Sequence, residues 1–291
     1  MTRLLVAVWF ALGRLPFGLY RALSSVLAAV LAVFVFLLAR ERRQVTLINL
    51  KLCFPQVSNS ARAVWAFQHM YFYLRTFLDR AWLWDGGGDV VRQRVRILNP
   101  EALSVLSDGQ ATIFLAPHFL GLDAAWSRLC MEVDMVTMYS NQKNPHLNNL
   151  ILAGRSKFGN PLLLSRQQGV RPLVAAMKQG RPLYYLPDMD FGERDSVFVS
   201  FFGVQAATVT AVARLSKLLK AKVVPVTTRY ASGCYEVLIH PPLQNFQSND
   251  ETSATQQINH CIEEWVKDNV TQYLWLHKRF KTRPQGEARI Y

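Results

Sequence analysis

The stretch TIFLAPHFLGLDAAWSRLCME, residues 112–132, decides the fold. Residues 112–116 form a short apolar run typical of a buried strand, and residues 122–132 are typical of a helix. The turn between them, APHFLG at 116–121, therefore follows the carboxyl end of a strand. Open α/β sheets place their ligands at that edge, so this turn is the first place to look for chemistry.

The same alternation continues along the chain beyond residue 95. Further strands are predicted at residues 135–139, 161–164, 183–186, 222–228 and 235–240. Helices are predicted between or after them at residues 147–158, 170–179, 208–220 and 253–267. Strands alternating with helices indicate an α/β fold, a mainly parallel central sheet flanked by helices.

The first part of the chain has a different texture. Residues 4–39 are almost continuously apolar, and the densest part, residues 23–38, runs straight into Arg40-Glu41-Arg42-Arg43. Sixteen residues give a helix of about 24 Å, against roughly 30 Å for a hydrocarbon core. No small-residue cleavage site follows, so we expect an uncleaved membrane-anchoring helix, either spanning the bilayer or lying in its cytoplasmic leaflet. A buried core helix is the alternative.

The aromatic-rich residues 61–84 predict another helix. The chain is therefore expected to have two domains: an anchor at 1–43 and an α/β domain with a helical N-terminal part at 44–291.

The composition agrees with a membrane setting. Of 291 residues, 51% are hydrophobic and only 18% charged, whereas about 25% is usual for a soluble chain. The net charge of +13 is concentrated at the two ends; in residues 1–78 Glu41 is the only acid. Basic residues mixed with long apolar stretches fit an anionic lipid surface better than a nucleic acid.

His118 and Asp123 are the candidate catalytic pair in the turn after the strand at 112–116. On one helix they would lie too far apart around the axis to meet, but across a tight turn the carboxylate can reach the imidazole. Such a pair makes histidine a general base, with aspartate holding its tautomer. The spacing occurs by chance in many sequences, and a packed or surface histidine is the alternative. No G-x-S-x-G accompanies the pair, which favours activation of a substrate hydroxyl over an enzyme nucleophile.

A second polar cluster, residues 186–195, contains Asp188 and Asp190 and follows another predicted strand. Its carboxylates fit a loop that pairs with arginines or accepts backbone hydrogen bonds better than a metal site. The apolar run VFVSFFG at 197–203 fits an acyl-chain groove or core packing equally well. Basic residues suited to anion contacts, each also typical of a surface charge, are Arg155, Arg166, Lys281 and Arg283.

Several longer strings, taken together, resemble the late acyltransferases of bacterial lipid A biosynthesis, the lauroyl and myristoyl enzymes of the lysophospholipid acyltransferase superfamily. They are APHFLGLD at 116–123, MYSNQKNP at 138–145, GRSKFG at 154–159, YLPDMDFGERDSVFVSFFGVQAAT at 185–208 and QYLWLHKRFKTRPQG at 272–286. The resemblance covers nearly the whole chain, and the two longest strings are the most specific.

The resemblance implies an enzyme that transfers a fatty acyl chain from acyl-acyl carrier protein to a hydroxyacyl group of a Kdo-bearing lipid A precursor. His118 would deprotonate the hydroxyl and Asp123 would orient His118. Arg155, Arg166, Lys281 and Arg283 would contact substrate, and Asp188 and Asp190 would have a structural or substrate-positioning role. The resemblance implies no metal or other cofactor, no nucleic acid partner, and a place at the bacterial inner membrane with the catalytic domain on the cytoplasmic face.

One position departs from the family pattern. Many relatives carry arginine directly after the tyrosine of the M-Y string, where this chain has Ser140. One expected anion contact is therefore missing or supplied elsewhere, which bears on the identity of the acceptor. Two alternatives to a lipid A enzyme stay open: an acyltransferase for another glycolipid or aminolipid, and an inactive membrane-associated binding protein. The sequence identifies neither the donor chain length nor the group that stabilises the oxyanion.

Overall fold

A seven-stranded sheet lies at the centre of the computed structural model, which describes residues 3–246 and 249–291. The strand order is β1-β9-β8-β2-β5-β3-β4. The bounds are β1 (Val95–Ile97), β2 (Thr112–Leu115), β3 (Val136–Tyr139), β4 (Leu162–Ser165), β5 (Leu183–Tyr185), β8 (Lys222–Ala231) and β9 (Cys234–Ile239). Neighbours pair in parallel except β8 with β9, which form an antiparallel hairpin. The α/β class and the mainly parallel sheet predicted from the sequence are confirmed.

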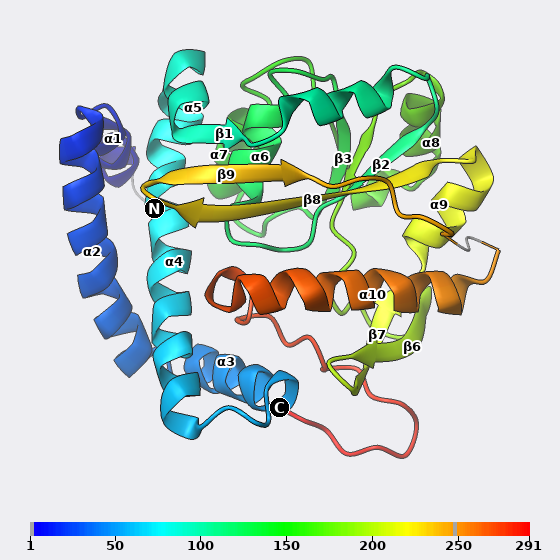
Figure 1. Ribbon diagram of the computed structural model, residues 1–291. Helices are drawn as coiled ribbons and strands as arrows, with labels where there is room; N and C mark the ends of the chain where they lie inside the picture. Colours follow the sequence, from blue (N-terminus) through cyan, green and yellow to red (C-terminus); the bar gives the residue numbers. More distant parts are fainter. Residues whose placement is uncertain (1–2, 247–248) are drawn as a thin grey trace.

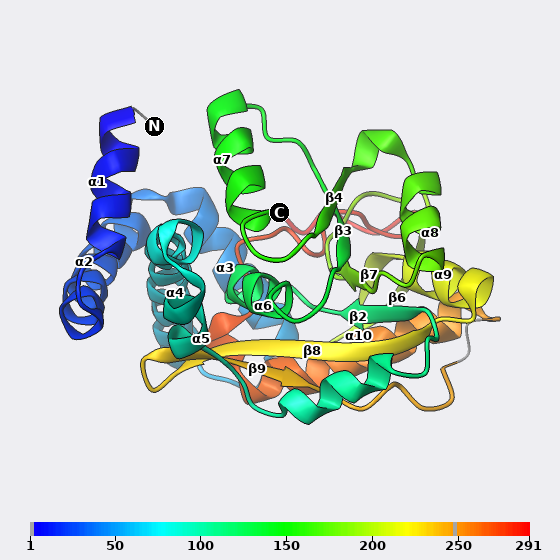
Figure 2. The same ribbon diagram turned by 90° about the horizontal axis from the view of Figure 1, so that it is seen from above.

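Strand β2 shows how the sheet divides the core in two. All four of its side chains are buried, and successive side chains point to opposite faces. Ile113 and Leu115 join an apolar cluster with α8 (Arg171–Lys178), α9 (Ala211–Leu219) and α10 (Glu251–Asp268). Phe114 joins a second cluster with α4 (Asn59–Asp85), α6 (Leu122–Leu129) and α7 (Pro145–Arg155). Figure 2 shows α4, α6 and α7 as neighbours on one side of the sheet.

The N-terminal helices stand at one edge of the molecule. They are α1 (Arg3–Gly13), α2 (Phe17–Leu38) and α3 (Arg40–Cys53), and each contacts α4. Figure 1 shows α2 lying along α4 at the rim, away from the centre of the sheet. Helix α5 (Gly88–Arg94) follows α4, and short 3-10 turns occupy Pro100–Leu106, Arg166–Gln168 and Val270–Gln272.

Helix α2 packs on α4 through one narrow stripe. Its buried residues recur every four positions, Tyr20, Ser24, Ala28 and Ala32, and the three small ones allow close approach of the two helices. Tyr20 also donates a 2.8 Å hydrogen bond to Asp79 of α4. Apart from Arg21 and Ser25 near its start, the remaining face of α2 is apolar and partly or fully exposed.

By length and composition α2 qualifies as a membrane helix. Its most apolar 18-residue stretch has a mean hydropathy of 2.4, and at 1.5 Å per residue its 22 residues extend about 33 Å. The exposed apolar side chains include Val26 (64% exposed), Phe34 (56%) and Leu37 (62%). The predicted apolar N-terminal helix is present, and its outward face is available for contact with lipid.

The run at 197–203 forms a hairpin that was not predicted. Strands β6 (Ser196–Phe201) and β7 (Val204–Val209) pair antiparallel apart from the main sheet. Phe201 is fully buried against Tyr273 and Phe280, so this side chain belongs to the core and does not line an acyl groove. The helix predicted at 208–220 begins only at Ala211, because residues 208 and 209 complete β7.

Candidate active site

His118 lies just beyond the end of β2, in the turn that precedes α6. Its backbone N–H donates to Asp188 Oδ2 at 2.9 Å, and its ring Nδ1 lies 2.7 Å from Asp188 Oδ1. Asp188 follows β5, the strand that pairs with β2 in parallel. Because the carboxyl ends of adjacent parallel strands meet at one edge of a sheet, residues 70 positions apart come into contact here.

The environment of Asp188 fixes the tautomer of His118. Asp188 is only 2% exposed. Burial would raise its pKa, but the charge and hydrogen bonds of His118, with a further hydrogen bond from Tyr273, outweigh burial and lower it. An ionised carboxylate is only an acceptor, so Nδ1 of His118 carries the hydrogen and Nε2 keeps its lone pair. The imidazole is 16% exposed, and its basic nitrogen is accessible.

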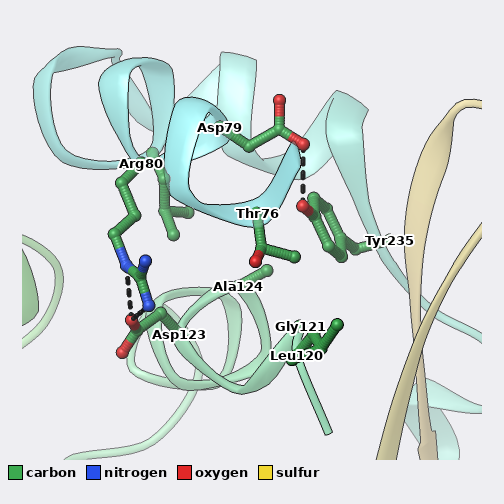
Figure 3. Close-up of a pocket in the computed structure, with 9 residues that line it drawn as sticks. Thr76, Asp79, Arg80, Leu120, Gly121, Asp123, Ala124 and Tyr235 are labelled. Carbon is green, nitrogen blue, oxygen red and sulfur yellow. Dashed lines mark hydrogen bonds and ion pairs between the residues drawn. The ribbon is translucent and has the colours of Figure 1, made fainter. Parts of the chain in front are cut away.

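Asp123 does not orient His118, contrary to the sequence prediction. Its Oδ1 pairs with Arg155 of α7 and its Oδ2 with Arg80 of α4, both at 2.8 Å. Figure 3 shows Arg80 reaching from α4 to Asp123 at the start of α6. Two charge-assisted pairs occupy both oxygens, and no hydrogen bond joins Asp123 to His118 in the described residues. Asp188 takes the place on the imidazole that was assigned to Asp123.

The ion pairs of Asp123 with Arg80 and Arg155 connect three helices, α6, α4 and α7. Burial would raise the pKa of Asp123, but the charges of Arg155 and Arg80 lower it to about 2. The cavity beside it, between α4, α6 and β9, has a volume of about 10 Å³, close to the minimum that holds one water. Gly121 closes one wall: a Cβ there would lie 2.7 Å from Thr228 Cγ2. This region therefore supports the turn that carries His118 and is too small to hold a lipid.

Asp190 anchors the chain's closing segment to the same loop. Its carboxylate accepts hydrogen bonds of 2.7 Å from both the backbone N–H and the hydroxyl of Thr282, and one of 2.9 Å from Gly192 N–H. Its own N–H donates to Nε2 of His277 at 2.9 Å. These contacts give Asp190 a structural role. No group of three His, Cys, Asp or Glu side chains suited to a metal ion occurs in the part of the chain that the structure describes.

The predicted anion contacts separate into two kinds. Arg155 is engaged by Asp123, and Arg283 by Glu287 and the carbonyl of Gln205. Arg166 is exposed, and its guanidinium lies 3.9 Å from the ring centroid of Phe191 in the acidic loop. Lys281 is also exposed. Within residues 3–246 and 249–291, neither Arg166 nor Lys281 pairs with a carboxylate, so these two remain free to meet an anion.

Three residues of this region were missed by sequence reasoning: Arg80, Tyr273 and His277. Arg80 lies within the predicted aromatic helix, which carried no signal for an ion pair. Tyr273 and His277 lie in the string QYLWLHKRFKTRPQG, which was singled out as specific. That string pointed to the right segment, but only the fold shows that it lies beside His118.

The fold and the site together define a class: α/β proteins with a hydrogen-bonded histidine–aspartate pair at the carboxyl edge of a mainly parallel sheet. Among the described residues, His118 bonds through its ring and its N–H to Asp188 and to no Ser, Thr or Cys side chain. The chain belongs to the bacterial lipid A biosynthesis acyltransferases, whose family model matches residues 1–282.

Curated relatives agree with this assignment. The chain is 31% identical to the lipid A biosynthesis myristoyltransferase of Escherichia coli K12, over 87% of this chain and 80% of the relative. It is 28% identical to the lauroyltransferase of the same strain, over 87% and 83% of the two chains. It is 29% identical to the palmitoleoyltransferase, over 97% and 94%. These matches identify the chain as a lipid A acyltransferase.

Proposed function

We propose that this enzyme transfers a fatty acyl chain from acyl-acyl carrier protein to a hydroxyacyl group of a Kdo-bearing lipid A precursor. The observation that carries the proposal is the geometry of His118. Asp188 holds its Nδ1–H, and Nε2 presents a lone pair at the carboxyl edge of the sheet. A base in this state suits a hydroxyl acceptor, the group that each such precursor offers.

The reaction follows from that geometry. Nε2 of His118 takes the proton of the acceptor hydroxyl while the oxygen attacks the carbonyl carbon of the thioester. A C–O bond forms, the C–S bond breaks, and the thiolate of the carrier protein leaves. The imidazolium, stabilised by Asp188, then returns its proton to the thiolate. Asp123 acts indirectly, by holding α6 against α4 and α7.

The apolar outer face of α1 and α2 supports a place at the membrane. We infer that residues 1–43 attach the enzyme to the bacterial inner membrane and that residues 44–291 form the catalytic domain on its cytoplasmic face. Arg40, Arg42 and Arg43 follow directly on the apolar helix, and positive residues favour the cytoplasmic side. The acceptor carries long acyl chains, so a site beside the membrane spares it transfer through water.

Unpaired positive charges near the site suit both substrates. Arg166 and Lys281 can meet the phosphates of the acceptor or the acidic surface of the carrier protein. A guanidinium stacked on an aromatic ring, as Arg166 is on Phe191, keeps its donors facing outward. We infer that these two residues contribute to binding and not to the proton transfer.

The test is an assay of purified protein in detergent with a Kdo-bearing lipid A precursor and acyl-acyl carrier proteins of several chain lengths. Wild type is expected to give the acylated product, and His118→Ala to give none above background. His260→Ala, a change of an exposed histidine on α10, is the matched control and is expected to keep full activity. Equal product from wild type and His118→Ala would refute the general base. Product with another glycolipid or aminolipid, and none with the precursor, would favour the alternative acceptor.

A further inference from the structure

A second histidine lies beside the first. His277 belongs to the closing segment, which runs antiparallel to the turn that carries His118. Leu274 N–H donates to the carbonyl of His118 at 3.0 Å, and Phe119 pairs with Tyr273 in a β-bridge. The segment that ends in His277 is thus hydrogen-bonded directly to the turn that carries the proposed base.

The hydrogen on the His277 ring is placed by Asp190. The backbone N–H of Asp190 donates to Nε2 of His277 at 2.9 Å. Nε2 must therefore keep its lone pair, and in the neutral ring the hydrogen lies on Nδ1. Burial, and then the positive charge of His118, lower the pKa of His277 to about 4. His277 thus stays neutral even when His118 holds the transferred proton.

The two rings present complementary atoms. Nε2 of His118 and Nδ1 of His277 bond to no atom of the described residues, and neither is fully buried. One offers a lone pair and the other an N–H. Both rings are held by the same short loop, His118 through Asp188 and His277 through Asp190.

We propose that the Nδ1–H of His277 donates a hydrogen bond to the carbonyl oxygen of the thioester and stabilises the oxyanion that forms on attack. The proposal rests on the proposed function. As the alkoxide attacks, the C=O π electrons move to oxygen, and a fixed donor is needed where that negative charge develops. A neutral donor serves this purpose because it releases no proton to the intermediate and does not compete with His118 for the substrate hydroxyl.

Two conservative variants separate this role from a structural one. In His277→Gln the amide oxygen can still accept the Asp190 N–H, but the Nδ1 donor is lost. In His277→Asn an amide N–H lies near the position of Nδ1, but the contact with Asp190 is lost. We expect His277→Gln to lower kcat by about a hundredfold to a thousandfold, with KM for the acyl-acyl carrier protein and the melting temperature unchanged. His277→Asn is expected to recover at least about tenfold of that loss.

The matched control is His240→Gln. His240 is another partly buried histidine whose pKa is lowered by burial, and it follows β9, two strands away from β2, where it contacts Thr227 and Trp265. It is expected to keep wild-type kcat. The tautomer of His277 is read separately from nitrogen NMR of the solubilised enzyme, and a neutral ring with hydrogen on Nδ1 at pH 6 is expected.

The outcomes are distinguishable. If wild type is active and His277→Gln keeps more than about a tenth of its kcat, the oxyanion role is refuted and the proposed function stands. If His277→Gln loses activity only in proportion to folded protein, or NMR places the hydrogen on Nε2, the role is likewise refuted. An inactive wild type overturns the proposed function, and this proposal with it.

Discussion

The change Asp188→Asn tests the central hydrogen-bond pair. Asp188 Oδ2 faces the backbone N–H of His118 at 2.9 Å, and Oδ1 faces ring Nδ1 at 2.7 Å. A backbone N–H can only donate, so the asparagine must turn its oxygen toward it and its NH₂ toward Nδ1. Nδ1 then has to accept, the ring hydrogen moves to Nε2, and the base loses the lone pair that it needs.

The expected loss of kcat is large because asparagine at position 188 permits only the tautomer of His118 that has its hydrogen on Nε2. In Ser-His-Asp triads the corresponding change lowers kcat about 10⁴-fold, or about 5 kcal/mol at 1.36 kcal/mol for each power of ten. We expect a loss of this order in kcat, measured by acyl transfer at saturating substrate, with a melting curve to confirm that the protein is folded. Asp195→Asn, in the same loop but 62% exposed at its side chain, is the control and is expected to keep kcat. If Asp188→Asn retains a tenth of wild-type kcat, the reasoning is wrong.

Three further predictions concern stability and membrane contact. The pKa of Asp123 is lowered from 3.8 to about 2, so the ionised carboxylate contributes about 2 kcal/mol to the free energy of unfolding, fully present above pH 4 and lost as pH falls through 2. In acid denaturation, the stability of Asp123→Asn should lack this pH dependence. The same dependence of stability on pH in the variant and in wild type would argue against the ion pairs. Gly154→Ala places a Cβ 2.3 Å from Trp84 Cγ and should cost about 1–3 kcal/mol in urea unfolding, whereas no loss would mean that α7 moves freely against α4. Phe34→Lys on α2 should weaken binding to anionic vesicles roughly tenfold, about 1.4 kcal/mol, while Leu218→Lys on α9 should leave it unchanged; equal effects would exclude a specific lipid-facing surface.

The position of His118 could be predicted because it depends on a local pattern. An apolar run, a turn and a helix follow each other within 21 residues, and the structure places β2 and α6 there. The partner of His118 could not be predicted in the same way. Whether Asp123 or Asp188 meets the ring depends on which strand lies next to β2, and the strand order is set by packing across the whole chain. From the sequence, Asp188 was expected to have a structural or substrate-positioning role, and its contact with His118 was not predicted.

The hairpin of β6 and β7 shows another limit. Its turn residues, Phe202 and Gly203, both have positive φ, 52° and 78°, as the tight turns of two-residue hairpins require. Asparagine or aspartate before glycine is the usual sequence signal for such a turn. Phenylalanine stands at that position here, so the sequence does not predict the turn. Two contacts offset the backbone strain of the positive φ at Phe202: its ring packs on Phe54, and its N–H donates to Glu263 of α10 at 2.7 Å.

Helix α4 has a consequence for any attempt to shorten the chain. Asp79 accepts hydrogen bonds from Tyr20 of α2 and from Tyr235 of β9, and the next residue, Arg80, pairs with Asp123 beside the turn that carries His118. Residues 3–38 are therefore packed into the fold and do not form a separate anchor that can be removed without effect. Removing them would uncover the stripe on α4 that Ala28 and Ala32 cover and would strip one partner from a carboxylate inside the fold. Loss of activity in a truncated protein would thus report damage to the scaffold under His118 as well as release from the membrane.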